Sequence, residues 1–102
     1  AEAAATVIAF WKSSAQGEPA NGGTHFVAAP GLVQRITGPL QLCGPGALHA
    51  TMNPSVWIGD RLWIVALYGE VARAQDKCGA LHREFLGEIT SPLHAPTKRG
   101  AV

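Results

Sequence analysis

An unbroken apolar run at residues 62–67 constrains the fold of this chain most strongly. The run reads LWIVAL, with Tyr68 after it and Gly69 at its end. It is too short to form an independent helix, and it has no charged side to face water. Its β-branched and aromatic residues are typical of a strand that is buried on both faces. We therefore expect a strand over 62–68 to pass through the middle of the protein.

The composition predicts one globular domain. A length of 102 residues is close to the usual size of a single domain, and 47% hydrophobic residues suffice for a core. We assign residues 1–90 to this domain and residues 91–102, which contain prolines and a Lys-Arg pair, to a flexible tail. Charged residues make up only 15%, against about 25% in typical proteins. This small charged surface favours a protein partner or a homo-oligomer.

Charge and hydropathy argue against several other classes of function. The net charge is +1 and no basic cluster occurs, whereas binding to a nucleic-acid backbone requires several grouped cations. The first twelve residues resemble neither a secretory signal nor a membrane span. Two cysteines do not form a disulfide framework, which favours reduced thiols in the cytoplasm. We expect no nucleic-acid or membrane partner.

Local patterns predict a mainly antiparallel sheet. Strands are expected at 6–12, 40–43 and 47–51, and Asn21-Gly22 predicts a tight turn into a strand at 25–27. No connection is long enough for a crossover helix between parallel strands.

One helix is expected beside this sheet. Asn53 suits an N-cap, Pro54 suits the first helical position, and Gly59 suits the end of a short helix near 54–58. Residues 79–89 combine helical spacing with flanking glycine, so both helix and strand remain open there. The predicted fold class is α+β, with the sheet built around the strand at 62–68.

His49 and Glu70 are the candidate catalytic residues. His49 follows a Gly-Pro-Gly turn, and its imidazole would titrate near neutrality and pair with the Cys43 thiol if the two came within hydrogen-bond reach. Glu70 follows the buried strand, at the end where acids gather in many enzyme sites. Two structural alternatives remain open. His49 would then be a core histidine that bonds to the backbone, and Glu70 the first solvated residue after the strand.

Two further sets of side chains are candidates for binding. Cys43, His49, Cys78 and His82 offer the two thiols and two imidazoles of a zinc site. Their spacing differs from the usual C-x2-C pairs, and buried cysteines often act as small hydrophobes, so we assign no metal and no cofactor. Three aromatic residues are the candidates for contact with a ring-bearing ligand, although a small core also needs such residues: Trp57, Trp63 and Tyr68.

Residues 42–89 resemble an uncharacterised family of small proteins from bacteriophages and prophages. The shared pattern has a Cys, a Leu-His-Ala-Thr segment, a Pro, Gly-Asp-Arg-x-Trp, a strand ending in Gly-Glu-Val, Asp-Lys, and a closing Leu-x-Arg-Glu and Ile. The matching positions are Cys43, Leu48, His49, Ala50, Thr51, Pro54, Gly59, Asp60, Arg61, Trp63, Val65, Leu67, Gly69, Glu70, Val71, Asp76, Lys77, Leu81, Arg83, Glu84 and Ile89. In similar proteins the closing segment is strand-like, which favours a strand at 80–89. The resemblance implies no activity, and it implies a location in the host cytoplasm or in a virion.

The same order of elements is also similar to ADP-ribosyltransferase-like folds. That resemblance implies that His49 contacts a nicotinamide nucleotide and that Glu70 is the catalytic acid. The chain is short for such a fold, and fold alone does not give function. The leading hypothesis is therefore a phage-derived binding or assembly module. The alternatives are an ADP-ribosyltransferase-like enzyme and a zinc-stabilised domain.

Overall fold

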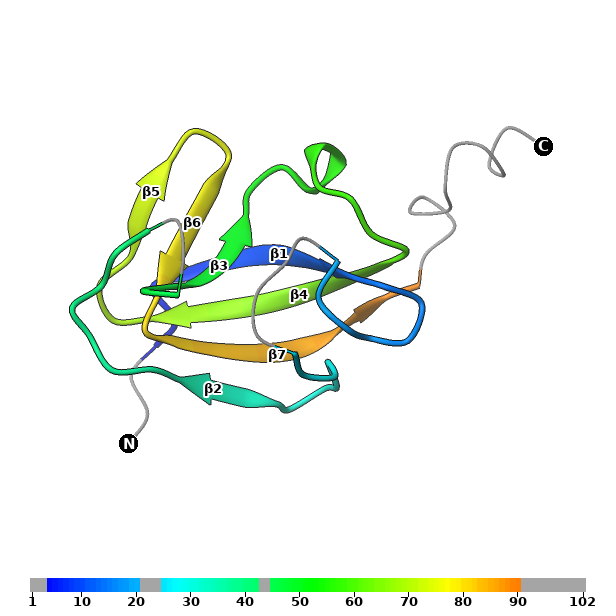
Figure 1. Cartoon of the computed structure of the whole chain (residues 1–102), viewed down its shortest axis with the longest axis horizontal. Coiled ribbons are helices and arrows are strands. Elements are labelled where there is room, and N and C mark those ends of the chain that lie inside the picture. Colours follow the sequence, from blue (N-terminus) through cyan, green and yellow to red (C-terminus); the bar gives the residue numbers. More distant parts are fainter. Residues whose placement is uncertain (1–3, 21–24, 43–44, 91–102) are drawn as a thin grey trace.

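The computed structural model describes residues 4–20, 25–42 and 45–90, which form one antiparallel sheet (Figure 1). The spatial order of its strands is β2-β7-β4-β1-β3-β6-β5. Their bounds are β1 Val7–Ser13, β2 Val33–Arg35, β3 Leu48–Thr51, β4 Arg61–Tyr68, β5 Ala72–Ala74, β6 Lys77–Ala80 and β7 His82–Ile89.

The fold is all-β, so the predicted α+β class is wrong. The helix expected near 54–58 is only a 3-10 turn, η1 (Pro54–Val56), and the described residues contain no α-helix. The Asn53 side chain makes no capping bond to the backbone. Trp57 is already extended, and its indole N–H donates to Asp76 Oδ2 at 3.1 Å. This long-range bond holds Trp57 outside a helix, so tertiary structure overrides the local helix signals. No helical segment in the described ranges has the length and apolarity to cross a membrane.

The strand expected at 62–68 is β4, which lies between β1 and β7. Most of its residues are buried on both faces, as its apolar run predicts. The strand expected at 6–12 is β1, in which alternate residues are buried. Because side chains alternate across a strand, Val7, Ala9 and Trp11 share one face, here called the inner face, and Ile8, Phe10 and Lys12 share the outer face.

Several connections differ from the expectations. Residues 25–27 and 40–42 are not strands, while Cys43 and the Asn21-Gly22 turn lie outside the described residues. Residues 73–77, expected as a polar connection, comprise the turn of the β5–β6 hairpin and the strand residues next to it. Gln75 in its turn has a φ of 53°, a conformation that usually signals glycine. Residues 82–89 form β7, so the strand interpretation of the closing segment is correct over that range.

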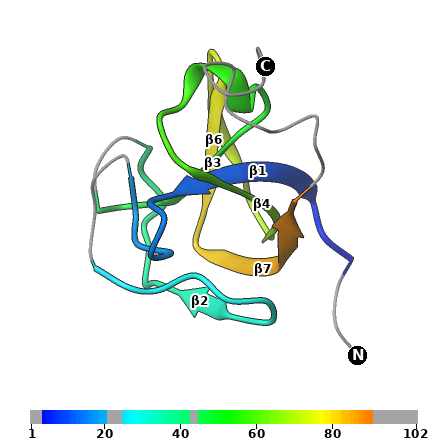
Figure 2. The same cartoon turned by 90° about the vertical axis from the view of Figure 1, so that its right-hand side faces the viewer.

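The core lies against the inner face. Phe85 contacts Trp11 and Trp63 edge-on, with ring centroids 4.9 and 5.9 Å apart, and Phe26 stacks on Trp11 at 5.1 Å. A single residue pair, Phe10 with Thr51, joins β1 to β3. The sheet bends there, and small residues of β3 and β6 join the same core. Figure 2 shows the loops 14–20 and 25–32 on one side of β1, β4 and β7; this is the side of the core.

Candidate functional sites

His49 lies in β3, opposite Gly79 of β6, and is half-buried. Its backbone carbonyl accepts a hydrogen bond of 2.7 Å from Arg83 Nη1. Burial, and then the nearby charges of Lys77 and Arg83, lower the pKa of His49 below its ordinary value. The imidazole is therefore neutral at physiological pH.

The lowered pKa of His49 predicts a loss of stability in mild acid. Below about pH 6.5 the unfolded chain binds a proton at His49 before the folded protein does, so the free energy of unfolding falls as the pH is lowered. Urea unfolding between pH 7.5 and 5 should show this decline, and His49→Gln should reduce its slope. The exposed His25 provides the control, because His25→Gln removes an imidazole but leaves His49 in place. An unchanged slope in His49→Gln would contradict the prediction.

Glu70 does not adjoin His49. It is exposed in the turn after β4, next to Gly69, whose φ is 77°. Gly79 pairs with His49 on one side and with Ala72 on the other. Two strand spacings, about 10 Å, therefore separate the backbones of His49 and Ala72. Glu70 lies two residues before Ala72, outside β5, so the sheet does not place the two candidate catalytic side chains in contact.

The described members of the nominal zinc set do not converge. Cys78 is fully buried in the core, where burial raises the pKa of its thiol and its Sγ lies 3.7 Å from the Ala50 carbonyl oxygen. His82 lies in β7 with its ring 4.5 Å from that of Tyr68. Cys43 lies outside the described residues. Within the described ranges, no group of three or more His, Cys, Asp or Glu residues is arranged to hold a metal ion.

The three candidate ligand-binding aromatics occupy separate places. Trp63 is 1% exposed, and its indole N–H donates to Ser13 Oγ at 2.9 Å. Trp57 is bound to Asp76, as described above. Tyr68 lies at the other end of β4, and its hydroxyl donates to Glu84 at 2.8 Å. They therefore do not form one aromatic pocket; Trp63 is a core residue.

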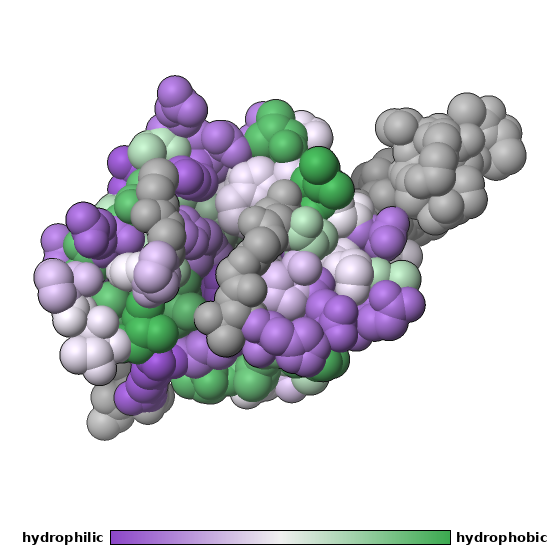
Figure 3. Space-filling model, viewed as in Figure 1, coloured by the Kyte–Doolittle hydropathy of each residue, from purple (hydrophilic) through white to green (hydrophobic). Residues whose placement is uncertain are grey.

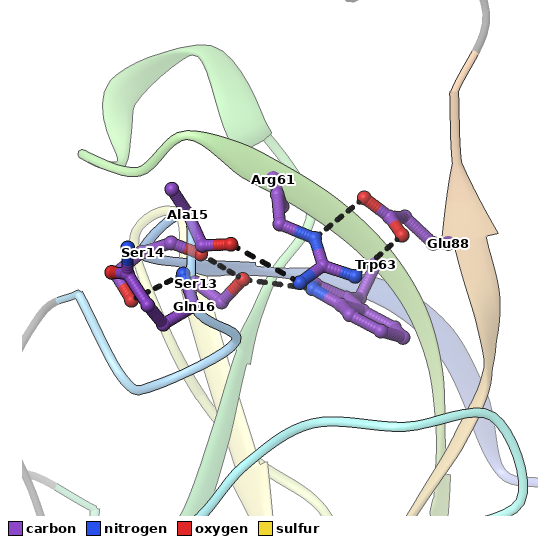
Figure 4. A network of polar contacts seen from close by, with 7 residues as sticks. All are labelled: Ser13, Ser14, Ala15, Gln16, Arg61, Trp63 and Glu88. Atoms are coloured by element: carbon purple, nitrogen blue, oxygen red, sulfur yellow. Dashed lines mark hydrogen bonds and ion pairs between the residues drawn. The ribbon is translucent and has the colours of Figure 1, made fainter.

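A polar cluster at the start of β4 fastens the sheet to the loop after β1 (Figure 4). Arg61 donates two bonds of 2.8 Å to Glu88 of β7 and one of 3.3 Å to the Ala15 carbonyl. Its guanidinium also lies 4.9 Å from the Trp63 ring. Ser13 accepts from Trp63 and donates to the Ser14 carbonyl. Because these donors and acceptors satisfy one another, we assign the cluster a structural role.

Arg83 is a buried cation that the sequence interpretation missed. It is only 4% exposed, and its guanidinium lies 5.1–5.5 Å from the rings of Phe85, Trp11 and Phe26. Its Nε donates to Gln34 Oε1 at 3.1 Å, and its Nη2 donates to the same oxygen. No described carboxylate forms an ion pair with it. A signal was available, because Arg83 and Phe85 are two residues apart and so share the inner face of one strand.

The outer face of β1, β4 and β7 carries a second apolar layer. Ile8 is 50% exposed there, and Leu86, the residue that forms a bulge in β7, is 45% exposed. Leu62 and Ala66 are buried but lie outside the core cluster. The loop-covered side of the molecule in Figure 3 shows hydrophilic groups interspersed with apolar ones, which gather at the left and along the lower edge of the view. The strand register arranges the outer side chains in three rows: Ile8, Ala66 and Glu84; Phe10, Ile64 and Gly87; Lys12, Leu62 and Ile89.

Comparisons with known proteins assign no function to these sites. No protein-family model, curated protein or solved structure matches the chain. The resemblances to a phage family and to ADP-ribosyltransferase-like folds therefore stay predictions, as does the expected location in the host cytoplasm or a virion.

Proposed function

We propose that this protein is an assembly module in which the outer face of the β1–β4–β7 sheet packs on the same face of a second copy. The observation that supports this most is the apolar character of that face. Ile8, Phe10, Ile64, Leu86 and Ile89 are all at least partly exposed on it. Contiguous exposed apolar surface is uncommon on monomers and marks interaction sites.

The charges at the edge of this face favour a second copy as the partner. Lys12 and Glu84 occupy opposite corners of the three rows. They are about 13 Å apart along the strands and about 10 Å apart across them. A two-fold axis in the interface, perpendicular to the line from Lys12 to Glu84, brings each Lys12 position over the Glu84 of the other copy. There the Lys12 ammonium would exchange its bond to the Trp57 carbonyl for the Glu84 carboxylate. Opposite charges at symmetry-related positions make a surface self-complementary.

The same two-fold axis also places side chains of complementary size opposite one another. It places Phe10 of one copy over Ala66 of the other, and Gly87 over the position of Leu62, whose side chain is already buried within its own copy. Large residues thus meet small ones, as close packing requires. The remaining apolar positions, Ile8, Ile64 and Ile89, lie near the axis and meet their own symmetry mates. The strands of the two sheets cross at roughly 70°, close to the orthogonal class of sheet packing.

Gly87→Lys tests this proposal without disturbing the fold. A Cβ at Gly87 meets no atom within 4 Å, so a lysine there projects from the outer face into open space. In the dimer it would bury an unpaired charge between the two sheets, which is costly. The face is small, so we expect a wild-type dissociation constant on the order of 10 μM. We expect Gly87→Lys to weaken association at least about tenfold in sedimentation equilibrium.

The matched control is Val27→Lys. Val27 is 54% exposed in the loop that covers the opposite side of the sheet, so the change adds the same charge at a similarly exposed apolar position. It should leave the dissociation constant within about twofold of the wild type. A wild type that remains monomeric at millimolar concentration, or equal weakening by the two variants, would overturn the proposal.

A further inference from the structure

A second feature, independent of the outer face, points to a ligand. The Arg83 guanidinium carries five N–H donors, of which Nε and one on Nη2 bond to Gln34 Oε1, and one on Nη1 bonds to the His49 carbonyl. This leaves one N–H on Nη1 and one on Nη2 without an acceptor among the described residues. The neighbouring aromatic rings offer only their faces. Both acceptors are neutral, so within the described part of the chain the positive charge is buried without a counter-charge.

A buried guanidinium in this position is unfavourable unless an anion binds to it. Burial of a cation without a paired anion costs far more than burial of a neutral group. The guanidinium stays charged at neutral pH, because burial lowers the pKa of Arg83 only to about 9. Gln34 and Phe26, which contact it, are each partly exposed. The guanidinium therefore lies one layer of side chains beneath the surface, where a small anion can reach it through a local movement of that layer.

We propose that Arg83 is the centre of an anion-binding site that accepts a carboxylate or phosphate group. The two remaining N–H groups of Nη1 and Nη2 suit the oxygens of such an anion, which guanidinium recognises with paired hydrogen bonds. Gln34 holds the other edge of the guanidinium and fixes its plane. The Trp11 and Phe26 rings, stacked at 5.1 Å, exclude water and strengthen the attraction between the anion and Arg83.

Thermal unfolding in matched salts tests the site. The wild type is melted in sodium phosphate and in sodium acetate, each against sodium chloride at equal ionic strength. We expect phosphate or acetate to raise the melting temperature by about 5 °C at ten times its dissociation constant. A larger rise in one of the two salts identifies the preferred anion. No rise over chloride in either salt overturns the proposal.

The Gln34→Glu variant introduces a carboxylate of the chain itself next to Arg83. Glutamate has the size of glutamine and would place a carboxylate oxygen on Nε and Nη2 of Arg83. We expect this variant to melt higher than the wild type in chloride and to lose most of the rise that phosphate or acetate causes. Arg83→Met removes the cation and should abolish the rise. If Arg83→Met does not fold, Gln34→Glu still tests the proposed site. A rise in melting temperature with phosphate or acetate that equals the wild-type rise would contradict it.

Discussion

Phe85→Ala should lower the free energy of unfolding by about 3–5 kcal/mol. Phe85 is completely buried at the centre of the aromatic core, between Trp11, Trp63 and Phe26. Its removal leaves a cavity that these large rings cannot fill without rotating out of their contacts. A small domain has only about 5–15 kcal/mol of stability in total, so the variant should be partly unfolded at 37 °C.

Urea denaturation measures this loss, with Val33→Ala as the control. Val33 is an apolar residue of β2 that is 46% exposed, so its truncation should change the free energy of unfolding by no more than about 0.5 kcal/mol. Similar losses in the two variants would show that Phe85 is not central to the core.

Gly59→Ala should destabilise the fold by about 1–3 kcal/mol through overpacking. A Cβ at Gly59 would lie 2.5 Å from Lys12 Cβ, 3.1 Å from the Ser13 carbonyl oxygen and 3.3 Å from the Lys12 carbonyl carbon. These atoms belong to the backbone of β1 or lie next to it, so they cannot move aside as a flexible side chain does. The segment before β4 must shift away from β1, which strains the hydrogen bond of 2.8 Å from Asp60 N–H to the Ser13 carbonyl.

The same substitution at Gly87 is the matched control. Gly87 has open space at its Cβ, so Gly87→Ala should leave the free energy of unfolding unchanged or raise it by up to about 1 kcal/mol, since alanine restricts the unfolded chain. Thermal unfolding of the two alanine variants at a low protein concentration makes the comparison. An equal effect of the two changes would argue against close contact between residue 59 and β1.

Short-range patterns predict the centre of this fold well. The apolar run at 62–67 corresponds to β4, and the alternation that follows Thr6 corresponds to β1. In both cases the buried positions are set by side chains within the strand itself. By contrast, the cap signals of Asn53 and Pro54 were outweighed by the bond from Trp57 to Asp76, which is distant in sequence. The turn at Gln75 carries no glycine to mark it.

The candidate sites depend on the register between neighbouring strands, which local sequence patterns do not predict. The Lys12–Glu84 diagonal follows from the register of β4 with β1 on one side and with β7 on the other. The separation of His49 from Glu70 likewise follows from the pairing of β3, β6 and β5. Arg83 was missed because a single charged residue in a strand usually faces water. Its place among aromatic rings follows from strands and a loop that are distant in sequence.

Zero-length carbodiimide cross-linking between two copies tests the proposed assembly most directly. Within one copy, Lys12 and Glu84 are roughly 16 Å apart on the grid of strands, too far for a direct amide bond. In this experiment, 15N-labelled and unlabelled protein are mixed at about 100 μM and cross-linked, and the cross-linked peptides are identified by mass spectrometry. The control is Lys12→Arg, which keeps the charge but removes the reactive amine. The proposed dimer predicts a Lys12–Glu84 amide that joins labelled to unlabelled chains and is absent from the control. Dimers without that amide, or no cross-linked dimers at all, would contradict it.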